Sequence, residues 1–168
     1  VGQFVVVRVD SFPESNRPPI GHIIDVVGDA SDSGIEVQVA VRTHDLPHEF
    51  SDEAIAQAKA FGNVIDPSIA ATRFDLRNLP FVTIDGEDAR DFDDAVCVAP
   101  REKNGWTLWV AIADVANYVE EQSPLDQTAV ERGTSVYFPS EVIPMLPETL
   151  SNGLCSLNPN VDRLALAV

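Results

Sequence analysis

Six acidic side chains lie within the twelve residues 83–94, together with a single arginine, Arg90. The acids are Asp85, Glu87, Asp88, Asp91, Asp93 and Asp94. Two like charges about 4 Å apart repel by roughly 4 kcal/mol at an effective dielectric constant near 20. A folded protein therefore keeps such a cluster only where something cationic offsets it. A metal ion is the expected cation.

Four of these acids, Asp85, Asp91, Asp93 and Asp94, have a spacing that suits metal binding. In an extended segment, Asp91 and Asp93 project to one face and Asp94 to the other, and a turn through Gly86 can bring Asp85 back toward them. Carboxylate oxygens suit magnesium, with manganese as an alternative, and such ions usually also bind substrate phosphates. Two ions about 3.5–4 Å apart can hold the attacking and leaving oxygens of an in-line displacement. The spacing therefore indicates phosphoryl chemistry.

Other interpretations of the acidic segment stay open from the residues alone. A solvated surface turn is common for a loop of this composition. A calcium-binding EF-hand loop is disfavoured, because the segment lacks the Asp-x-Asp-x-Asp-Gly order and the terminal Glu. Two carboxylates can also serve glycoside hydrolysis, but the local sequence does not establish the separation that this reaction requires.

The composition limits the class of protein. The chain has 11 Lys and Arg against 27 Asp and Glu, a net charge of −16, which opposes a nucleic-acid binder of the usual basic kind. Any RNA or DNA role must use metals, a localised basic groove or a separate domain. No apolar run approaches the roughly 20 residues of a membrane span, so no membrane segment is expected. Cys97 and Cys155 lack zinc-site or disulfide spacing, so a reducing cytoplasm is the expected location.

Two kinds of element are predicted before the acidic segment. Partly alternating β-branched residues predict strands over 4–9, 20–27 and 35–41, typical of a small antiparallel barrel or sheet. Ser51 is a plausible N-cap with acids in the first turn after it, which predicts a helix that ends near Gly62.

The acidic segment itself is predicted to connect two strands. Strands are expected over 81–84 and 95–99, followed by a buried strand over 106–114 after a Lys103-Asn-Gly105 turn. Further along, the pattern predicts a short helix over 125–132, a short strand over 135–138 and a helical turn over 147–154.

Residues 78–96, which contain the acidic segment, resemble the signature of the ribonuclease R and ribonuclease II family of exoribonucleases, the RNB domain family. Residues 109–115, 132–139, 142–148 and 150–159 resemble the same catalytic domain, in the same order. The resemblance implies magnesium-dependent, processive hydrolysis of RNA from a single-stranded 3′ end, in the 3′–5′ direction, which releases nucleoside 5′-monophosphates.

The resemblance also implies roles for particular residues. The four aspartates of the family match Asp85, Asp91, Asp93 and Asp94, which are expected to bind or orient the metal. Asp91 and Asp93 are the expected catalytic residues, and Asp93 is expected to be the least replaceable. Tyr137 matches an aromatic residue that stacks on an RNA base near the 3′ end, a contact that any base can make.

The predicted fold class is α+β. Residues 1–50 resemble the end of a cold-shock-like OB domain, and are expected to form a partial OB-type β-barrel. Residues 51–74 are predicted to be a helix and linker, and residues 75–168 resemble the N-terminal portion of the mixed α/β RNB catalytic domain.

Because the resemblance ends within that catalytic domain, we expect little or no nuclease activity from these 168 residues alone. Open strand edges and uncovered apolar faces would favour self-association. The alternative function is a truncated, non-catalytic RNA- or metal-binding fragment.

Overall fold

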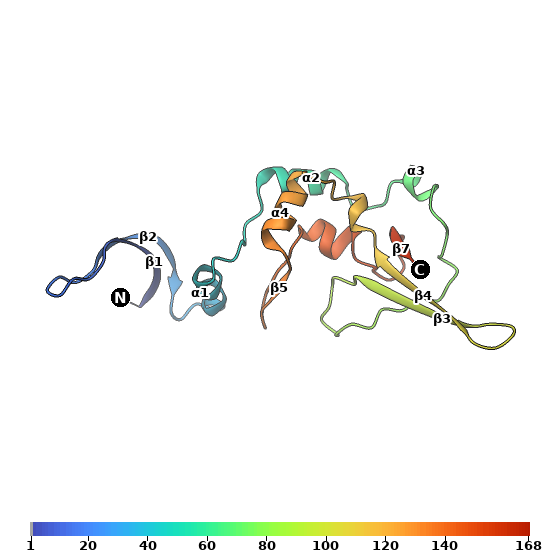
Figure 1. The fold of residues 1–168 in the computed structure, drawn as a ribbon, viewed down its shortest axis with the longest axis horizontal. Coiled ribbons are helices and arrows are strands. Elements are labelled where there is room, and N and C mark those ends of the chain that lie inside the picture. Colours follow the sequence, from blue (N-terminus) through green and yellow to red (C-terminus); the bar gives the residue numbers. More distant parts are fainter. Residues whose placement is uncertain (1) are drawn as a thin grey trace. The chain divides into compact units, whose positions relative to one another are not determined.

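The computed structural model describes residues 2–168, which divide into two compact units. The first unit contains the chain up to His48 together with Tyr137–Val142, and the second contains Glu49–Val136 and Ile143–Val168. Helices and small sheets are mixed along the chain (Figure 1), so the predicted α+β class is confirmed. Between residues 2 and 168, no helix has both the length and the apolar character that crossing a membrane requires.

The first unit is built on an antiparallel hairpin of β1 (Gln3–Ser11) and β2 (Ile20–Asp29), so the strands predicted over 4–9 and 20–27 are confirmed. Its apolar side chains remain largely exposed, as at Val7 (49%) and Ile23 (60%). The described residues form only this two-stranded sheet here, and no closed barrel. The hairpin therefore matches the expectation of a partial barrel.

The strand predicted over 35–41 is wrong, because these residues form helix α1 (Ile35–Thr43). The alternation of apolar residues that suggested a strand also places Val37 and Val41 one helical turn apart, and the structure buries both. Gly34, with φ 80°, precedes the helix, and Arg42 Nε lies 3.3 Å from Asp25 Oδ2 on β2. Packing against the hairpin has therefore overridden the β-branched composition.

The second unit contains a three-stranded antiparallel sheet in the order β3 (Asp94–Pro100), β4 (Trp106–Ala113), β7 (Ala165–Ala167). The strands predicted over 95–99 and 106–114 are confirmed. Asn104 and Gly105 have φ of 84° and 93°, the conformation that a tight hairpin turn requires. The predicted turn between these strands is therefore also confirmed.

The strand predicted over 81–84 is wrong in extent. Only Val82 pairs, through an isolated bridge in which it and Val96 exchange backbone hydrogen bonds of 2.9 and 2.8 Å. Ile84 is 85% exposed, so its side chain does not pack against the sheet. The segment therefore leaves the edge of the sheet soon after Val82, and the acids that precede Asp94 lie on a loop.

Two helices pack side by side in the second unit (Figure 1). Helix α2 (Asp52–Ala60) begins after Ser51, whose Oγ accepts a 3.2 Å hydrogen bond from the Ala54 N–H, as predicted. Helix α4 (Pro124–Arg132) confirms the helix predicted over 125–132. The shorter elements are α3 (Pro67–Ala70), the 3₁₀ turn η1 (Val115–Asn117), β5 (Val136–Tyr137), β6 (Val142–Ile143) and the π-helical turn η2 (Thr149–Leu154).

The hydrophobic core of the second unit is formed by α2, α4, η2 and the inner side of β4. Leu125 and Leu150 are fully buried, and the ring of Phe61 meets that of Tyr118 edge-on at 5.3 Å. Ala113, Leu154 and Cys155 belong to the same core. The end of β4 and the chain just after η2 are thus held rigidly, and both contact the acidic segment.

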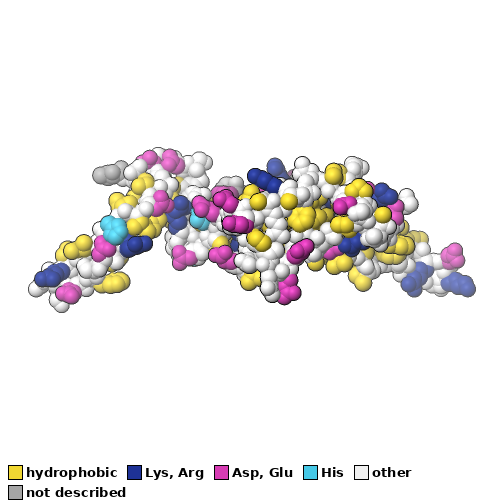
Figure 2. All heavy atoms as spheres, turned by 90° about the horizontal axis from the view of Figure 1, so that it is seen from above, with side chains coloured by type: hydrophobic (Ala, Val, Ile, Leu, Met, Phe, Trp, Pro, Cys, Tyr) yellow, Lys and Arg dark blue, Asp and Glu magenta, His cyan; other side chains and the backbone are white. Residues whose placement is uncertain are grey.

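The other side of the three-stranded sheet is an uncovered apolar surface, here called the outer sheet face. It comprises Val98, Trp106, Leu108, Ile112 and Leu166, which are 44–69% exposed. Trp106 and Trp109 point to opposite sides of the sheet, and only Trp106 is on this face. Hydrophobic side chains are visible at the molecular surface in Figure 2.

Candidate active site

The acidic segment leads from the bridge at Val82 into Asp94, the first residue of β3. Asp94 lies opposite Ile112 of β4, so the sheet fixes this end of the segment. The next residue, Ala95, is buried, whereas Asp94 is exposed, as the alternation of side chains along a strand requires. The carboxylate of Asp94 is therefore directed away from the core.

The other three predicted aspartates lie on the loop before β3. Asp85 and Asp93 are exposed, and Asp91 is half-buried. The Asp93 carbonyl accepts a 2.9 Å hydrogen bond from the backbone N–H of Ala113, the last residue of β4. The loop is therefore held to the rigid end of a core strand beside the predicted site.

A second set of hydrogen bonds holds the loop to the chain just after η2. The Phe92 N–H donates to Ser156 Oγ at 3.0 Å, and Ser156 Oγ donates to the Arg90 carbonyl at 2.7 Å. The Leu157 N–H donates to the Phe92 carbonyl at 2.9 Å. The loop backbone is thus fixed by two parts of the fold that are distant in sequence.

The four aspartates interact electrostatically. Although the Asp93 side chain is accessible, the loss of part of the hydration of its carboxyl raises its pKa above the usual value, and the negative charges of Asp91, Asp94 and Asp85 raise it further, in that order. All three neighbours therefore lie close enough to disfavour a negative charge on Asp93. A bound divalent cation would relieve this repulsion.

The donor chemistry of this cluster fits magnesium, because all four side chains offer hard carboxylate oxygens. The side chains as they stand do not converge: within residues 2–168, no three His, Cys, Asp or Glu side chains form a group that could hold a metal ion. The structure thus brings Asp85, Asp91 and Asp94 within electrostatic reach of Asp93 without assembling a finished coordination shell. Their assignment as metal ligands stays a prediction.

A cysteine nucleophile is disfavoured in this region. Cys155 is 3% exposed, and burial raises the pKa of its thiol to about 12. The charges of Asp114 and Asp93 act in the same direction. The reactive thiolate is therefore scarce at neutral pH, and the carboxylates remain the groups best suited to chemistry here.

A pocket of about 620 Å³ opens beside the acidic segment. Its walls carry two arginines, Arg90 and Arg163, and three side-chain amides, which can donate hydrogen bonds to an anionic ligand. The sequence carries no signal that could have assigned Asn63 to this pocket, because a lone Asn in a linker belongs to no pattern. The lining residues are Asn63, Ala89, Arg90, Phe92, Glu148, Thr149, Asn152, Gly153, Asn158 and Arg163.

Tyr137, the predicted base-stacking residue, is the last residue of β5 and is 62% exposed. It is grouped with the first unit, whereas the four aspartates belong to the second. Its exposure is what a stacking contact requires, since a base needs access to one ring face. The role of Tyr137 in RNA binding stays a prediction.

Asp114, at the end of β4, is occupied by a structural contact. Its side chain is only 6% exposed, and its Oδ2 lies 2.8 Å from Arg73 Nη2. The same nitrogen donates to Asn117 Oδ1 at 3.3 Å, and the Asp114 N–H donates to the Leu164 carbonyl at 2.9 Å. Asp114 thus joins the linker to the core.

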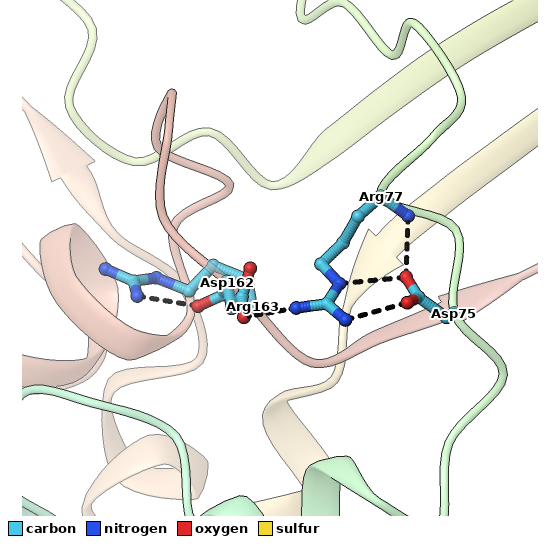
Figure 3. Close-up of polar contacts among 4 residues, drawn as sticks. All are labelled: Asp75, Arg77, Asp162 and Arg163. Carbon is cyan, nitrogen blue, oxygen red and sulfur yellow. Dashed lines mark hydrogen bonds and ion pairs between the residues drawn. The ribbon is translucent and has the colours of Figure 1, made fainter.

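A more exposed ion-pair network joins the linker to the chain before β7. Arg77 lies between two carboxylates (Figure 3), with Nη2 at 2.7 Å from Asp75 Oδ2 and Nη1 at 3.0 Å from Asp162 Oδ2. Hydrogen bonds from Arg77 lower the pKa of Asp75 to about 2. Arg163 Nη1 donates to the Asp162 carbonyl at 2.9 Å (Figure 3). Its Nε donates to the Gly153 and Ser156 carbonyls at 2.8 and 3.0 Å.

This network predicts a pH-dependent stability difference between the wild-type chain and Arg77→Met. The folded-state pKa of Asp75 is lower than its unfolded value, so its contribution is complete above about pH 5 and is lost as the pH falls toward 2. Thermal unfolding followed by circular dichroism should show a constant difference in Tm near neutral pH and a smaller one near about pH 3. Arg101→Met is the control, because Arg101 Nε donates to the Thr107 hydroxyl and, among residues 2–168, Arg101 forms no ion pair with a carboxylate. An equal pH dependence of this variant would contradict the prediction.

Two family models match the chain. That of the RNB domain matches residues 73–168, and that of a cold shock domain matches residues 1–51. Ribonuclease R of Acidithiobacillus ferrooxidans is 53% identical over 165 residues, which cover 98% of this chain and 37% of the relative. Ribonuclease R of Escherichia coli (strain K12) is 52% identical over 166 residues, which cover 99% of this chain and 20% of the relative. The chain thus spans well under half the length of these relatives.

Solved structures share the fold. The apo form of Mycoplasma genitalium RNase R has a TM-score of 0.88 and 34% identity, covering 99% of this chain and 26% of that one. The same protein in complex with double-stranded RNA has a TM-score of 0.86 and 33% identity, covering 99% and 29%. Yeast Ssd1, a pseudonuclease, has a TM-score of 0.71 at 21% identity, covering 99% and 21%, a likeness in fold alone.

The RNB domain model covers more than half of the chain, and the residues that it matches include all four aspartates and Tyr137. The resemblance inferred from the acidic segment and the motifs after it is therefore confirmed: the chain belongs to the RNB domain family.

Proposed function

We propose that this chain is the part of a 3′–5′ exoribonuclease that carries the aspartate cluster of its active site. The observation that carries the proposal is the acidic segment, in which four aspartates interact on a backbone held by β4 and by the chain after η2. Relatives that share most of its length are ribonucleases R. Since the chain spans only part of those relatives, we expect little or no hydrolysis by the 168 residues alone.

The proposed reaction is magnesium-dependent, processive hydrolysis of RNA. Asp91 and Asp93 act as catalytic residues and, with Asp85 and Asp94, hold the metal, for which manganese is the alternative. When bound, the metal supplies a positive charge that stabilises the phosphate in an in-line displacement. The oxygen of water forms a bond to phosphorus and the P–O3′ bond breaks. A nucleoside 5′-monophosphate leaves, and the released O3′ of the shortened RNA takes up a proton and becomes its new 3′ hydroxyl.

The proposed partner is RNA with a single-stranded 3′ end. Because the net charge is −16, attraction for RNA must arise locally, and Arg90 and Arg163 in the pocket beside the acidic segment supply it. The exposed ring of Tyr137 offers a stacking surface. A cytoplasmic location is proposed from Cys97 and Cys155, both free and buried.

A non-catalytic RNA- or metal-binding role is the alternative. Yeast Ssd1, a pseudonuclease, shares the fold, and a shared fold does not by itself establish an activity. The two functions differ in one respect that can be measured: only the first predicts metal-dependent release of mononucleotides.

The test uses a hybrid protein that has the full length of Escherichia coli ribonuclease R, with this chain in place of the matching segment. We expect magnesium-dependent shortening of 5′-labelled RNA by the hybrid, with nucleoside 5′-monophosphates as the released products. A folded hybrid that binds RNA but releases no mononucleotide at any magnesium or manganese concentration would contradict the catalytic proposal and support the alternative.

Self-association of the isolated chain is also proposed, through the outer sheet face. Leu108 is 57% exposed among other apolar residues, and its burial under another surface would lower the free energy of the system. Sedimentation velocity should show concentration-dependent oligomers, and Leu108→Glu should shift them toward monomer. A wild-type chain that stays monomeric at every concentration would contradict this proposal.

A further inference from the structure

One buried hydroxyl group joins the acidic segment to the chain after η2. Ser156 is 0% exposed, and its Oγ accepts a hydrogen bond from the Phe92 N–H at 3.0 Å and donates one to the Arg90 carbonyl at 2.7 Å. A hydroxyl has one proton to donate and lone pairs to accept, so both bonds form together. The two backbone groups belong to the residues immediately before and after Asp91.

These two bonds fix the backbone on both sides of Asp91. The Arg90 carbonyl is part of the peptide plane that precedes Asp91, and the Phe92 N–H is part of the plane that follows it. Each peptide plane is rigid, so φ and ψ of Asp91 are the rotations that relate the two planes. Tying both planes to one oxygen atom restricts these rotations, and with them the direction in which the Asp91 side chain leaves the backbone.

Ser156 is itself rigidly supported. The preceding residue, Cys155, lies in the hydrophobic core, and the Ser156 N–H donates to the Gly153 carbonyl at 3.1 Å. Arg163 Nε donates to the Ser156 carbonyl at 3.0 Å. The hydroxyl is therefore presented from a fixed point of the core, and its position does not depend on the loop that it holds.

From this arrangement we propose that Ser156 is a positioning residue that directs the Asp91 carboxylate toward the metal bound by the aspartate cluster. This inference rests on the function proposed above. When a group that orients a metal ligand without binding the metal itself is removed, the metal affinity or the activity typically falls by about 10–100-fold. Without the hydroxyl, the Phe92 N–H and the Arg90 carbonyl also lose a buried partner, and the loop can leave its present conformation.

The first test measures Mn²⁺ binding by electron paramagnetic resonance, on the 168-residue chain and on the hybrid. Ser156→Ala should weaken Mn²⁺ binding by about tenfold or more, and Ser156→Thr, which keeps the hydroxyl, should recover part of the affinity. Ser135→Ala is the matched control, because the Ser135 hydroxyl also accepts a hydrogen bond from a partly buried backbone N–H, that of Met145 at 3.0 Å, outside the acidic segment. Its Mn²⁺ affinity should equal that of the wild type.

The second test measures RNA hydrolysis by the hybrid. Ser156→Ala should lower kcat by about tenfold or more and leave KM for RNA nearly unchanged, since the loss is of metal placement and not of RNA contacts. A role limited to stability would lower the Tm without changing kcat at temperatures where both proteins are folded. If Ser156→Ala fails to fold, Ser156→Cys replaces it, because a thiol fills the space of the hydroxyl, although it is larger, and is a poor hydrogen-bond partner.

The outcomes separate this inference from the function on which it rests. A folded Ser156 variant with wild-type Mn²⁺ affinity and wild-type kcat would overturn the positioning role, while hydrolysis by the unmodified hybrid would leave the proposed function intact. An unmodified hybrid that neither binds Mn²⁺ nor hydrolyses RNA would overturn the function first, and the positioning role with it.

Discussion

Asp93→Asn in the hybrid is expected to reduce RNA hydrolysis by about 10²-fold or more while RNA binding is largely retained. The charges of Asp91, Asp94 and Asp85 all raise the pKa of Asp93, so its carboxylate is close to the other three members of the cluster. Asparagine preserves the shape of the side chain but removes the negative charge that a divalent cation needs. The rate is measured with 5′-labelled RNA, and binding by fluorescence anisotropy of the same RNA.

Asp88→Asn is the control for this substitution. Asp88 is an exposed acid in the same loop, outside the predicted metal set, so its change to asparagine alters the net charge equally. We expect hydrolysis close to that of the unmodified hybrid. Equal losses at Asp88 and Asp93 would show that the loop acts only through its total charge, and wild-type activity of Asp93→Asn would contradict its catalytic role.

Local signals in the sequence predicted those elements that local interactions determine. Ser51 begins α2 because its hydroxyl accepts a hydrogen bond from a residue only three positions later. The Asn104-Gly105 pair forms the turn of the β3–β4 hairpin because both residues tolerate positive φ. The acidic segment was recognisable for the same reason, since the four aspartates are close in sequence as well as in space.

The two wrong strands lacked this kind of local determinant. In residues 35–41, the spacing of the apolar side chains suits a strand or a helix, and contact with β2 decides between them. In residues 81–84, the β-branched composition favours a strand, but only Val82 has a partner, Val96, to pair with. Both outcomes depend on which surface the segment meets, and that information lies elsewhere in the chain.

The contacts that hold the candidate site could also not be predicted from the sequence. Ser156 and Arg90 are 66 positions apart, and no pattern around either residue indicates that they are hydrogen-bonded. The partners Arg73 and Asp114 are similarly distant, and the composition of the linker suggested only a connection. The chemistry of the site was thus predictable from one short segment, whereas the support of the site is a property of the folded second unit.

The ion pair between Arg73 and Asp114 is expected to make a large contribution to the stability of that unit. Arg73→Met would leave the carboxylate of Asp114, 6% exposed, without its cationic partner. Removing one member of a fully buried pair costs about 3–5 kcal/mol, and because Arg73 is itself 36% exposed we expect about 2 kcal/mol. The Tm from circular dichroism should therefore fall by roughly 5–10 °C.

A double-mutant cycle separates this pair from the other contacts of the two side chains. Asp114→Asn alone removes the charge that needs a partner but leaves the Arg73 guanidinium, which also donates to Asn117. The double variant Arg73→Met, Asp114→Asn should lose less stability than the sum of the two single losses, because the second change no longer strands a buried charge. Strictly additive losses would show that Arg73 stabilises the unit through packing or through Asn117, and that its contact with Asp114 contributes nothing measurable.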